Sequence, residues 1–182
     1  MTNLAPEDVF LTAGQFYFGS GVRVRTLLGT CVAITLWHPR RREGAICHYL
    51  LPRRGRGQSM EAAPGLYAHE VMQLFAEARR SNGTEAGSYV VKVFGGGHMF
   101  PEQITDEACR DASCSKARRE SCVSIGCQNI CAARHLLEAG GYAIAAEDVG
   151  GVGSRQIIFD LRSGDVWVKR GAAISAIAEV LA

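Results

Sequence analysis

A cysteine and a histidine at positions 31 and 48 are the side chains of this sequence best suited to covalent chemistry. Cys31 follows Gly29 and Thr30 where an apolar segment begins, and His48 stands on the next apolar segment. Glycine lets the backbone bend, so such a junction can present a thiol at the end of a strand. A free thiol has a pKa of about 8.5 and needs a base or a positive neighbour to react at neutral pH. The two residues therefore form a candidate nucleophile–base pair.

The same two residues also fit a less specific interpretation. A buried cysteine and a hydrogen-bonded core histidine are common in folded proteins. Ideal pairing of two strands does not set Cys31 directly opposite His48, so a bend at Gly29 or a β-bulge is expected to close the remaining gap. Taken alone, the pair is weak evidence for catalysis.

The other cysteines do not follow a recognisable metal-binding pattern. The chain has seven cysteines and begins without the features of a signal peptide, so no disulfide framework is expected. It contains no C-x-x-C pair, although zinc sites usually contain two. Cys127 and Cys131 could bind a metal with His98 or His135, but their spacing favours small core residues. The five cysteines that resemble a cluster are Cys109, Cys114, Cys122, Cys127 and Cys131. We expect no metal and no cofactor.

Two further features lie close to the Cys/His pair in the predicted fold. Cys47 precedes His48 on a strand, so its side chain is expected to point to the opposite face, into the core. Gly95, Gly96 and Gly97 end an apolar run but lack the pattern of a phosphate-binding loop. We expect them to allow a close approach of two backbones near the site.

Hydrophobic periodicity predicts the elements that position these residues. Residues 32–37 and 45–51 are expected to form a β-hairpin that carries Cys31 and His48 and ends at Pro52. Amphipathic helices are expected at 66–80 and 129–138, with a short final helix at 172–181. Further strands are expected at 15–18, 22–25, 89–94, 142–146, 156–161 and 166–169.

These elements predict one α/β domain over residues 1–182. Its mixed β-sheet is layered with helices, in a three-layer-like arrangement, because the strands form hairpins more often than βαβ units. The charged and poorly periodic stretch at 101–121 is expected to be a surface excursion.

Charge and hydropathy exclude several classes of function. The formal net charge is +2, which gives no argument for nucleic acid binding. No apolar run has the length of a membrane span, so we expect a cytoplasmic protein in a reducing compartment, with no membrane insertion. Two basic clusters, at residues 40–42 and 53–56, adjoin the predicted strands. They are solvated loops or, since both adjoin the predicted Cys/His hairpin, a surface for an acidic partner.

Five sequence blocks together resemble the CheD family of chemoreceptor glutamine deamidases. The first two blocks are T-L-L-G-T-C-V-A-I-T-L-W at 26–37 and C-H-Y-L-L-P at 47–52. They are followed by V-F-G-G-G-H-M-F at 93–100, S-I-G with Asn129, and E-D-V-G-G with Arg155. The blocks occur in the family's order from about Gly14 to Arg170. Any one of them is weak, but the set is specific.

The resemblance implies hydrolysis of glutamine side-chain amides on chemoreceptors. Cys31 is then the nucleophile, and His48 takes its proton and later delivers it to the leaving ammonia. The family also uses a threonine just upstream of the cysteine. Strict register puts Arg25 at that position, and the adjacent Thr26 is the candidate third residue. The backbone N–H of Cys31 or of Val32 is the expected oxyanion donor.

Binding without turnover is the alternative function. Family members are also partners of a CheC-type phosphatase, so this chain could regulate such a partner or the receptors. The arginine at position 25 gives this alternative some support, whereas the Cys/His pair favours the enzyme. The receptor glutamines, the phosphatase partner and the oligomeric state are left open.

Overall fold

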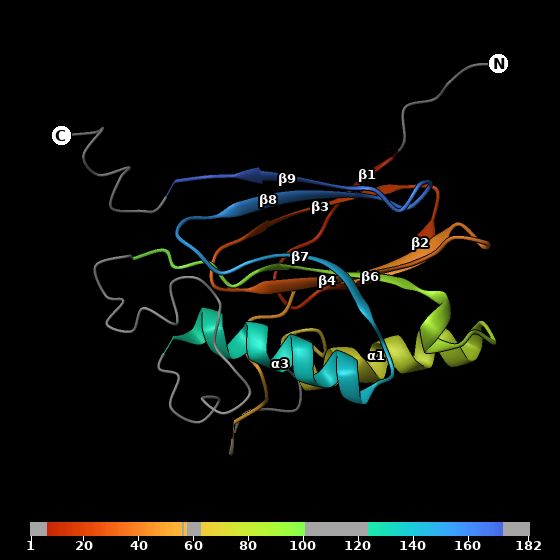
Figure 1. The fold of residues 1–182 in the computed structure, drawn as a ribbon, viewed down its shortest axis with the longest axis horizontal. Helices are drawn as coiled ribbons and strands as arrows, with labels where there is room; N and C mark the ends of the chain where they lie inside the picture. Colours follow the sequence, from red (N-terminus) through yellow and green to blue (C-terminus); the bar gives the residue numbers. More distant parts are fainter. Residues whose placement is uncertain (1–6, 56, 58–62, 101–123, 173–182) are drawn as a thin grey trace.

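Two mixed β-sheets and two helices make up the part of the chain that the structure describes (Figure 1). The computed structural model describes residues 7–55, 57, 63–100 and 124–172. The four-stranded sheet contains, in spatial order, β1 (Asp8–Phe10), β3 (Arg23–Leu28), β8 (Arg155–Asp160) and β9 (Val166–Arg170). The five-stranded sheet contains β2 (Phe16–Ser20), β5 (Glu43–Cys47), β4 (Val32–His38), β6 (Val90–Gly95) and β7 (Ile144–Val149). The helices are α1 (Ala68–Ser81) and α3 (Ile125–Ala139), with a short 3-10 turn, η1 (Ala86–Ser88).

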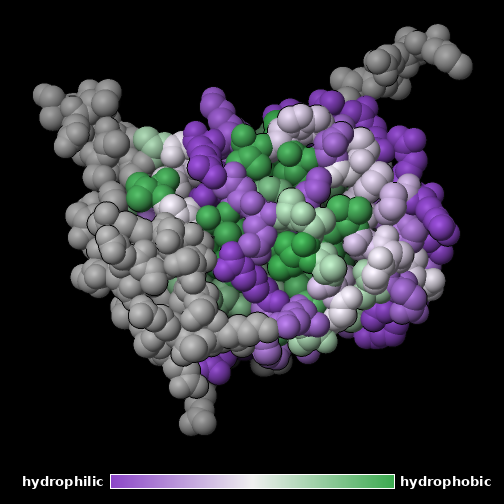
Figure 2. All heavy atoms as spheres, viewed as in Figure 1, coloured by the Kyte–Doolittle hydropathy of each residue, from purple (hydrophilic) through white to green (hydrophobic). Residues whose placement is uncertain are grey.

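The sheets and helices form three layers. The sheets lie face to face, and both helices cover the outer face of the five-stranded sheet (Figure 1). In the same view, hydrophobic residues gather in the middle of the visible face, interspersed with hydrophilic ones, and hydrophilic residues lie along its right-hand edge (Figure 2). Because the five-stranded sheet is the middle layer, it must bury side chains on both of its faces.

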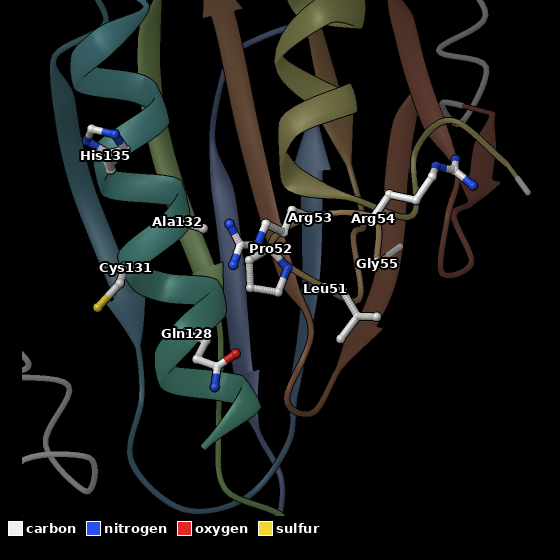
Figure 3. A pocket seen from close by; sticks show the side chains of 9 residues that line it. All are labelled: Leu51, Pro52, Arg53, Arg54, Gly55, Gln128, Cys131, Ala132 and His135. Atoms are coloured by element: carbon white, nitrogen blue, oxygen red, sulfur yellow. The ribbon is translucent and has the colours of Figure 1, made fainter. Parts of the chain in front are cut away.

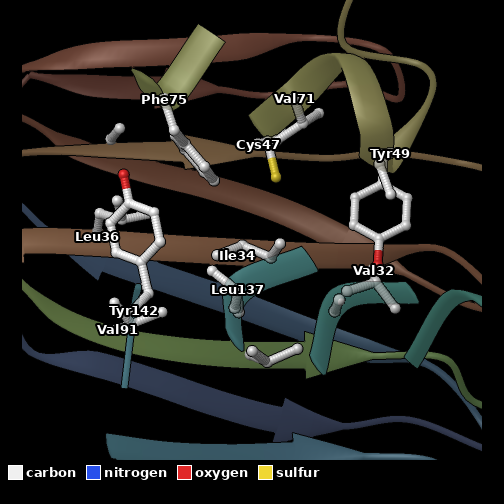
Figure 4. Packing of buried hydrophobic residues seen from close by; sticks show 14 of the residues in the cluster. Val32, Ile34, Leu36, Cys47, Tyr49, Val71, Phe75, Val91, Leu137 and Tyr142 are labelled. Atoms are coloured by element: carbon white, nitrogen blue, oxygen red, sulfur yellow. The ribbon is translucent and has the colours of Figure 1, made fainter. Parts of the chain in front are cut away.

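The central strand β4 shows this double burial directly. Val32, Ile34 and Leu36 pack toward the helices, in a cluster that includes Phe75 (Figure 4). Ala33, between them in sequence, packs in a second cluster between the two sheets. A strand buried on both faces needs a continuous apolar run, and this explains the uninterrupted V-A-I-T-L-W segment.

The structure confirms the α/β class and the predicted hairpin of β4 and β5, but it corrects the number of sheets. We expected one mixed sheet, and the strands divide into two. The short strand β1 was not predicted, and α3 begins at Ile125 rather than at residue 129. The strand expected at 45–51 ends at Cys47; beyond it, Tyr49 forms an isolated antiparallel bridge with Val32, and Leu51 forms a parallel bridge with Tyr67.

Some predictions concern residues outside the described ranges. The excursion at 101–121 and nearly all of the final helix at 172–181 fall there. The single domain over residues 1–182 stays a prediction. In the part of the chain that the structure describes, no helix combines the length and apolar character needed to cross a membrane.

Candidate active site

Cys31 and His48 lie on the same face of the five-stranded sheet, toward the four-stranded sheet. An antiparallel bridge joins Val32 and Tyr49, with hydrogen bonds of 3.1 and 3.0 Å between their backbones, and continues the register of β4 and β5. Val32 and Tyr49 both pack toward the helices. Since side chains alternate along a strand, the preceding residues Cys31 and His48 point the other way. Cys31 indeed packs against the cluster between the sheets.

The register makes Cys31 and His48 diagonal neighbours. Ala33 lies opposite His48, and Cys31 lies two residues away from Ala33 on the same face. Diagonal pairs in antiparallel sheets usually lie within about 8 Å, which long or aromatic side chains can span. The pairing itself therefore brings the two residues together, and the register of β4 with β5 shows no bulge.

Thr26 reaches His48 from the other sheet. It lies on β3, the residue is only 5% exposed, and its Oγ1 is 2.8 Å from Nδ1 of His48. The same hydroxyl donates its single proton to the carbonyl oxygen of Leu11 at 2.7 Å. It must therefore accept a hydrogen bond from Nδ1 of His48. This bond places the imidazole proton on Nδ1 and leaves Nε2 unprotonated.

Nε2 of His48 is available to take a proton. The atom is buried and has no hydrogen-bond partner in the part of the molecule that the structure describes. A buried acceptor without a partner is rare and needs an explanation, and a catalytic role is one. A neutral imidazole with a free Nε2, on the face that carries Cys31, is suited to accept the thiol proton.

Burial keeps both members of the pair uncharged. It lowers the pKa of His48 from 6.5 to about 4, against a smaller opposing effect of the Leu11 carbonyl. Burial also raises the pKa of the Cys31 thiol, partly offset by the Thr30 hydroxyl and by the backbone amide of Cys31 itself. At neutral pH the pair therefore rests as a thiol and a neutral imidazole, and the proton must move during the reaction.

The backbone beside Cys31 is held by the end of β6. The N–H of Gly96 donates to the carbonyl of Cys31, and the N–H of Gly97 donates to the carbonyl of Gly29, both at 2.8 Å. A Cβ atom on Gly95 would lie only 2.2 Å from the carbonyl oxygen of Cys31. The predicted close approach at Gly95, Gly96 and Gly97 is confirmed, and a side chain at Gly95 would prevent it.

One of the two expected oxyanion donors is already engaged. The N–H of Val32 donates to the carbonyl of Tyr49 within the bridge. The N–H of Cys31 has no backbone acceptor among the described residues. The structure therefore leaves Cys31 as the backbone donor beside the thiol.

The remaining predicted residues lie away from this pair. Arg25 points to the outer face of its sheet, where its Nε donates to Asp8 at 3.0 Å. Cys47 is fully buried on the helix side, as predicted. Cys127 and Cys131 are buried on α3, and no group of three metal-binding side chains occurs among the residues that the structure describes. Cys109, Cys114 and Cys122 lie outside those residues.

A groove on the helix side adjoins the segment that follows His48. It has a volume of about 660 Å³ and separates the segment 51–55 from α3 (Figure 3). Arg53 lines it, and so does Arg54, whose guanidinium binds Glu70 and stacks on Tyr67. His135 on α3 lines the same groove. One of the two predicted basic clusters thus borders a concave surface.

Sequence reasoning missed the contribution of the segment 11–15. The Leu11 carbonyl fixes the Thr26 hydroxyl, and backbone bonds from Gly14 to His48 and from His48 to Gln15 hold the histidine in place. Any residue can supply a backbone carbonyl or amide, so no side-chain pattern marks these positions.

A thiol, a neutral imidazole with a free nitrogen, and a hydroxyl that fixes the ring are the groups of a cysteine hydrolase site. A family model described as CheD chemotactic sensory transduction matches residues 50–170. The chain therefore belongs to the CheD family.

Relatives across most of the chain agree with this assignment. A protein of Dechloromonas aromatica is 40% identical over 163 residues, which cover 89% of this chain and 86% of the relative. A protein of Pseudomonas fluorescens is 41% identical, with coverage of 89% and 84%. One of Pseudomonas syringae pv. syringae is 40% identical over 169 residues, with coverage of 92% and 87%. All three are named "Probable chemoreceptor glutamine deamidase".

Proposed function

We propose that this chain is a chemoreceptor glutamine deamidase, which hydrolyses glutamine side-chain amides on methyl-accepting chemotaxis receptors during adaptation. Its membership of the CheD family and the names of its relatives support this function. The observation that carries the residue assignment is the hydrogen bond from His48 to Thr26, since it leaves the second imidazole nitrogen free. Cys31 is the nucleophile, His48 the base and Thr26 the residue that orients the imidazole.

The reaction starts from the neutral pair. Nε2 of His48 takes the thiol proton as Sγ of Cys31 attacks the amide carbon of glutamine, and the C=O electron pair moves to oxygen. The oxyanion accepts a hydrogen bond from the N–H of Cys31. The intermediate then collapses, the C–N bond breaks, and the imidazolium of His48 protonates the departing nitrogen as ammonia. A thioester to Cys31 remains.

Water completes the reaction. His48 removes a proton from water, the hydroxide attacks the thioester carbon, and the C–S bond breaks. His48 returns the proton to the sulfur of Cys31, which releases glutamate on the receptor and restores the resting pair. No cofactor enters either half of the reaction.

The substrate is proposed to be the cytoplasmic domain of a chemoreceptor, which places the enzyme in the cytoplasm. Arg53 and Arg54 border the groove beside α3 and suit an acidic helical surface. The alternative, a non-catalytic module that binds receptors or a CheC-type phosphatase, drew on the arginine at position 25. The bond between Thr26 and His48 favours the enzyme.

Ammonia release from a receptor cytoplasmic fragment, combined with mass spectrometry of the Gln-to-Glu change, tests the function. Wild type is expected to turn over, while Cys31→Ala and His48→Ala are not. Cys47→Ala is the matched control, because that buried cysteine faces the helices. Tight receptor binding without turnover by wild type would favour the regulatory module instead.

A further inference from the structure

Three consecutive carbonyl groups around the nucleophile are each held by a separate donor. Those of Gly29 and Cys31 accept from the end of β6, as described above. The carbonyl of Thr30, between them, accepts from Nδ2 of Asn129 at 3.0 Å. Asn129 lies on α3, so a residue of the helix layer is hydrogen-bonded to the peptide group that immediately precedes Cys31.

Asn129 uses both protons of its amide group. Nδ2 also donates to the carbonyl of Leu50 at 2.7 Å. Both partners are backbone carbonyls, which can only accept, so the orientation of the side-chain amide is fixed. One fully buried side chain thereby ties the residue before Cys31 to the second residue after His48.

Holding the Thr30 carbonyl also sets the direction of the Cys31 amide. The two groups belong to one planar peptide unit, and no peptide bond among the described residues is cis. In a trans unit the C=O and the N–H point in opposite directions. Since the Thr30 carbonyl is directed at Asn129 on α3, the N–H of Cys31 is directed away from α3, toward the side on which the thiol packs.

A second observation agrees with this direction. The backbone amide of Cys31 lies close enough to its own sulfur to lower the thiol pKa, against the larger effect of burial. A donor beside the attacking sulfur is well placed for the oxygen of a tetrahedral intermediate formed on that sulfur.

The asparagine at this position carries a cost as well as two hydrogen bonds. Its Oδ1 is buried and has no hydrogen-bond partner among the described residues. Such an unpartnered buried oxygen destabilises a fold. The benefit of the amide must lie in the two carbonyls that it holds.

We propose that Asn129 is a positioning residue that orients the N–H of Cys31 as the oxyanion donor of the reaction. It acts through the peptide of Thr30 and does not touch the substrate. The inference rests on the proposed deamidase function and adds a residue on the helix layer to the Cys/His/Thr set.

Comparing deamidation with alkylation of the same thiol separates this role from a merely structural one. Alkylation of Cys31 by iodoacetamide needs the thiol and its base, but displacement at the reagent's saturated carbon forms no oxyanion. Asn129→Ala is expected to lower kcat by about 100-fold. KM for the receptor fragment and the rate of Cys31 alkylation should change little, with mass mapping used to follow Cys31 alone.

Tyr49→Phe is the matched control, because it removes a different hydrogen bond to the same residue, Asn129. The Tyr49 hydroxyl donates to the backbone carbonyl of Asn129 at 2.7 Å, so the variant removes a buried anchor of α3 and keeps the side-chain bridge. It should keep kcat within a few-fold of wild type. A large loss of kcat in Tyr49→Phe would assign the effect to helix anchoring and overturn the proposal.

Asn129→Asp supplies a second, nearly isosteric variant. Its ionised carboxylate would face two carbonyls and could not donate, whereas the protonated acid, which burial favours, can again donate one bond. Its kcat should therefore rise relative to wild type as the pH falls toward 5. The proposal fails if Asn129→Ala keeps full kcat, if Asn129→Asp loses kcat relative to wild type as the pH falls, or if kcat and Cys31 alkylation fall together. Absence of turnover in wild type would refute the deamidase itself, a result distinct from these.

Discussion

Thr26 is the residue on which the orientation of His48 depends. Its hydroxyl is the acceptor for Nδ1, and donation to Leu11 leaves it no proton to offer the ring. We predict that Thr26→Val lowers kcat by about 100-fold, because a misplaced base loses about that much. Thr26→Ser keeps a hydroxyl at the same atom position and should retain most activity. Equal activity of the Val and Ser variants in ammonia release would contradict this role.

The low pKa of His48 predicts that Cys31 stays reactive to an unusually low pH. An ordinary imidazole would become protonated below pH 6.5, but burial moves this pKa to about 4. The base form therefore persists to lower pH, and the rate of Cys31 alkylation by iodoacetamide should fall only as the pH approaches 4. A rate that already halves near pH 6.5 would show that the imidazole is not held neutral.

Sequence patterns predicted Cys31 and His48 at this site. The alternation of side chains along β3 also indicates that Thr26, rather than Arg25, faces His48. Residues 22–25 alternate apolar and charged side chains, and continuing that alternation turns Thr26 inward with Val24 and Leu28. Arg25 then faces outward, as observed. The assignment of Thr26 as a functional residue stays a prediction.

At the scale of elements, the path of β6 past the Cys31 segment requires glycine. Gly95 has a φ of 107°, and a Cβ there would meet the Cys31 carbonyl. We predict that Gly95→Ala destabilises the protein by more than about 2 kcal/mol, from positive φ and overpacking together. Gly21→Ala is the control, because Gly21 also has positive φ but no atom within 4 Å of its Cβ position. Chemical denaturation measures both; equal losses would show that the close contact contributes nothing.

The helices and strands were largely predictable from the sequence, but the way in which the strands pair into two sheets was not. Periodicity identified the hairpin of β4 and β5, because alternation and turn residues are local features. It did not show that β3 and β4, separated by three residues, belong to different sheets. That division depends on which long-range pairings bury the most surface. The site lies between the sheets, so its third member could be proposed from sequence only through family resemblance.

At the scale of the whole molecule, the buried neutral histidine ties stability to pH. The folded pKa of His48 is lower than the unfolded value, so the folded state binds fewer protons between pH 6.5 and about 4. Stability from this group is full above pH 6.5 and is lost as the pH falls through that window, by up to about 3 kcal/mol. Hydrogen bonds from Arg162 lower the pKa of Asp160, so the stability that this carboxylate contributes is full above its ordinary pKa of 3.8 and is lost only below that pH.

Denaturant titrations at pH 7 and pH 4.5 test this dependence. The loss of unfolding free energy between the two pH values should be larger in wild type than in His48→Ala, which lacks the titrating group. If both proteins lose the same amount, the acid sensitivity arises elsewhere in the molecule.

Each of the three layers contributes different residues to the site. The five-stranded sheet carries Cys31 and His48, the four-stranded sheet supplies Thr26, and the helix layer supplies Asn129. The three layers therefore have to be assembled before the thiol, its base and its amide are aligned. We expect activity and native structure to be lost together on denaturation.

The most direct test of the account is to trap the acyl-enzyme. Wild type is mixed with a receptor cytoplasmic fragment, quenched in acid within one turnover, and analysed by mass spectrometry and peptide mapping. The account predicts a covalent enzyme–receptor species, lighter than the sum of its parts by one ammonia, joined through Cys31 and a receptor glutamine and cleaved by hydroxylamine. Cys31→Ala should form none. A covalent species through another cysteine, or ammonia release by Cys31→Ala, would contradict the account.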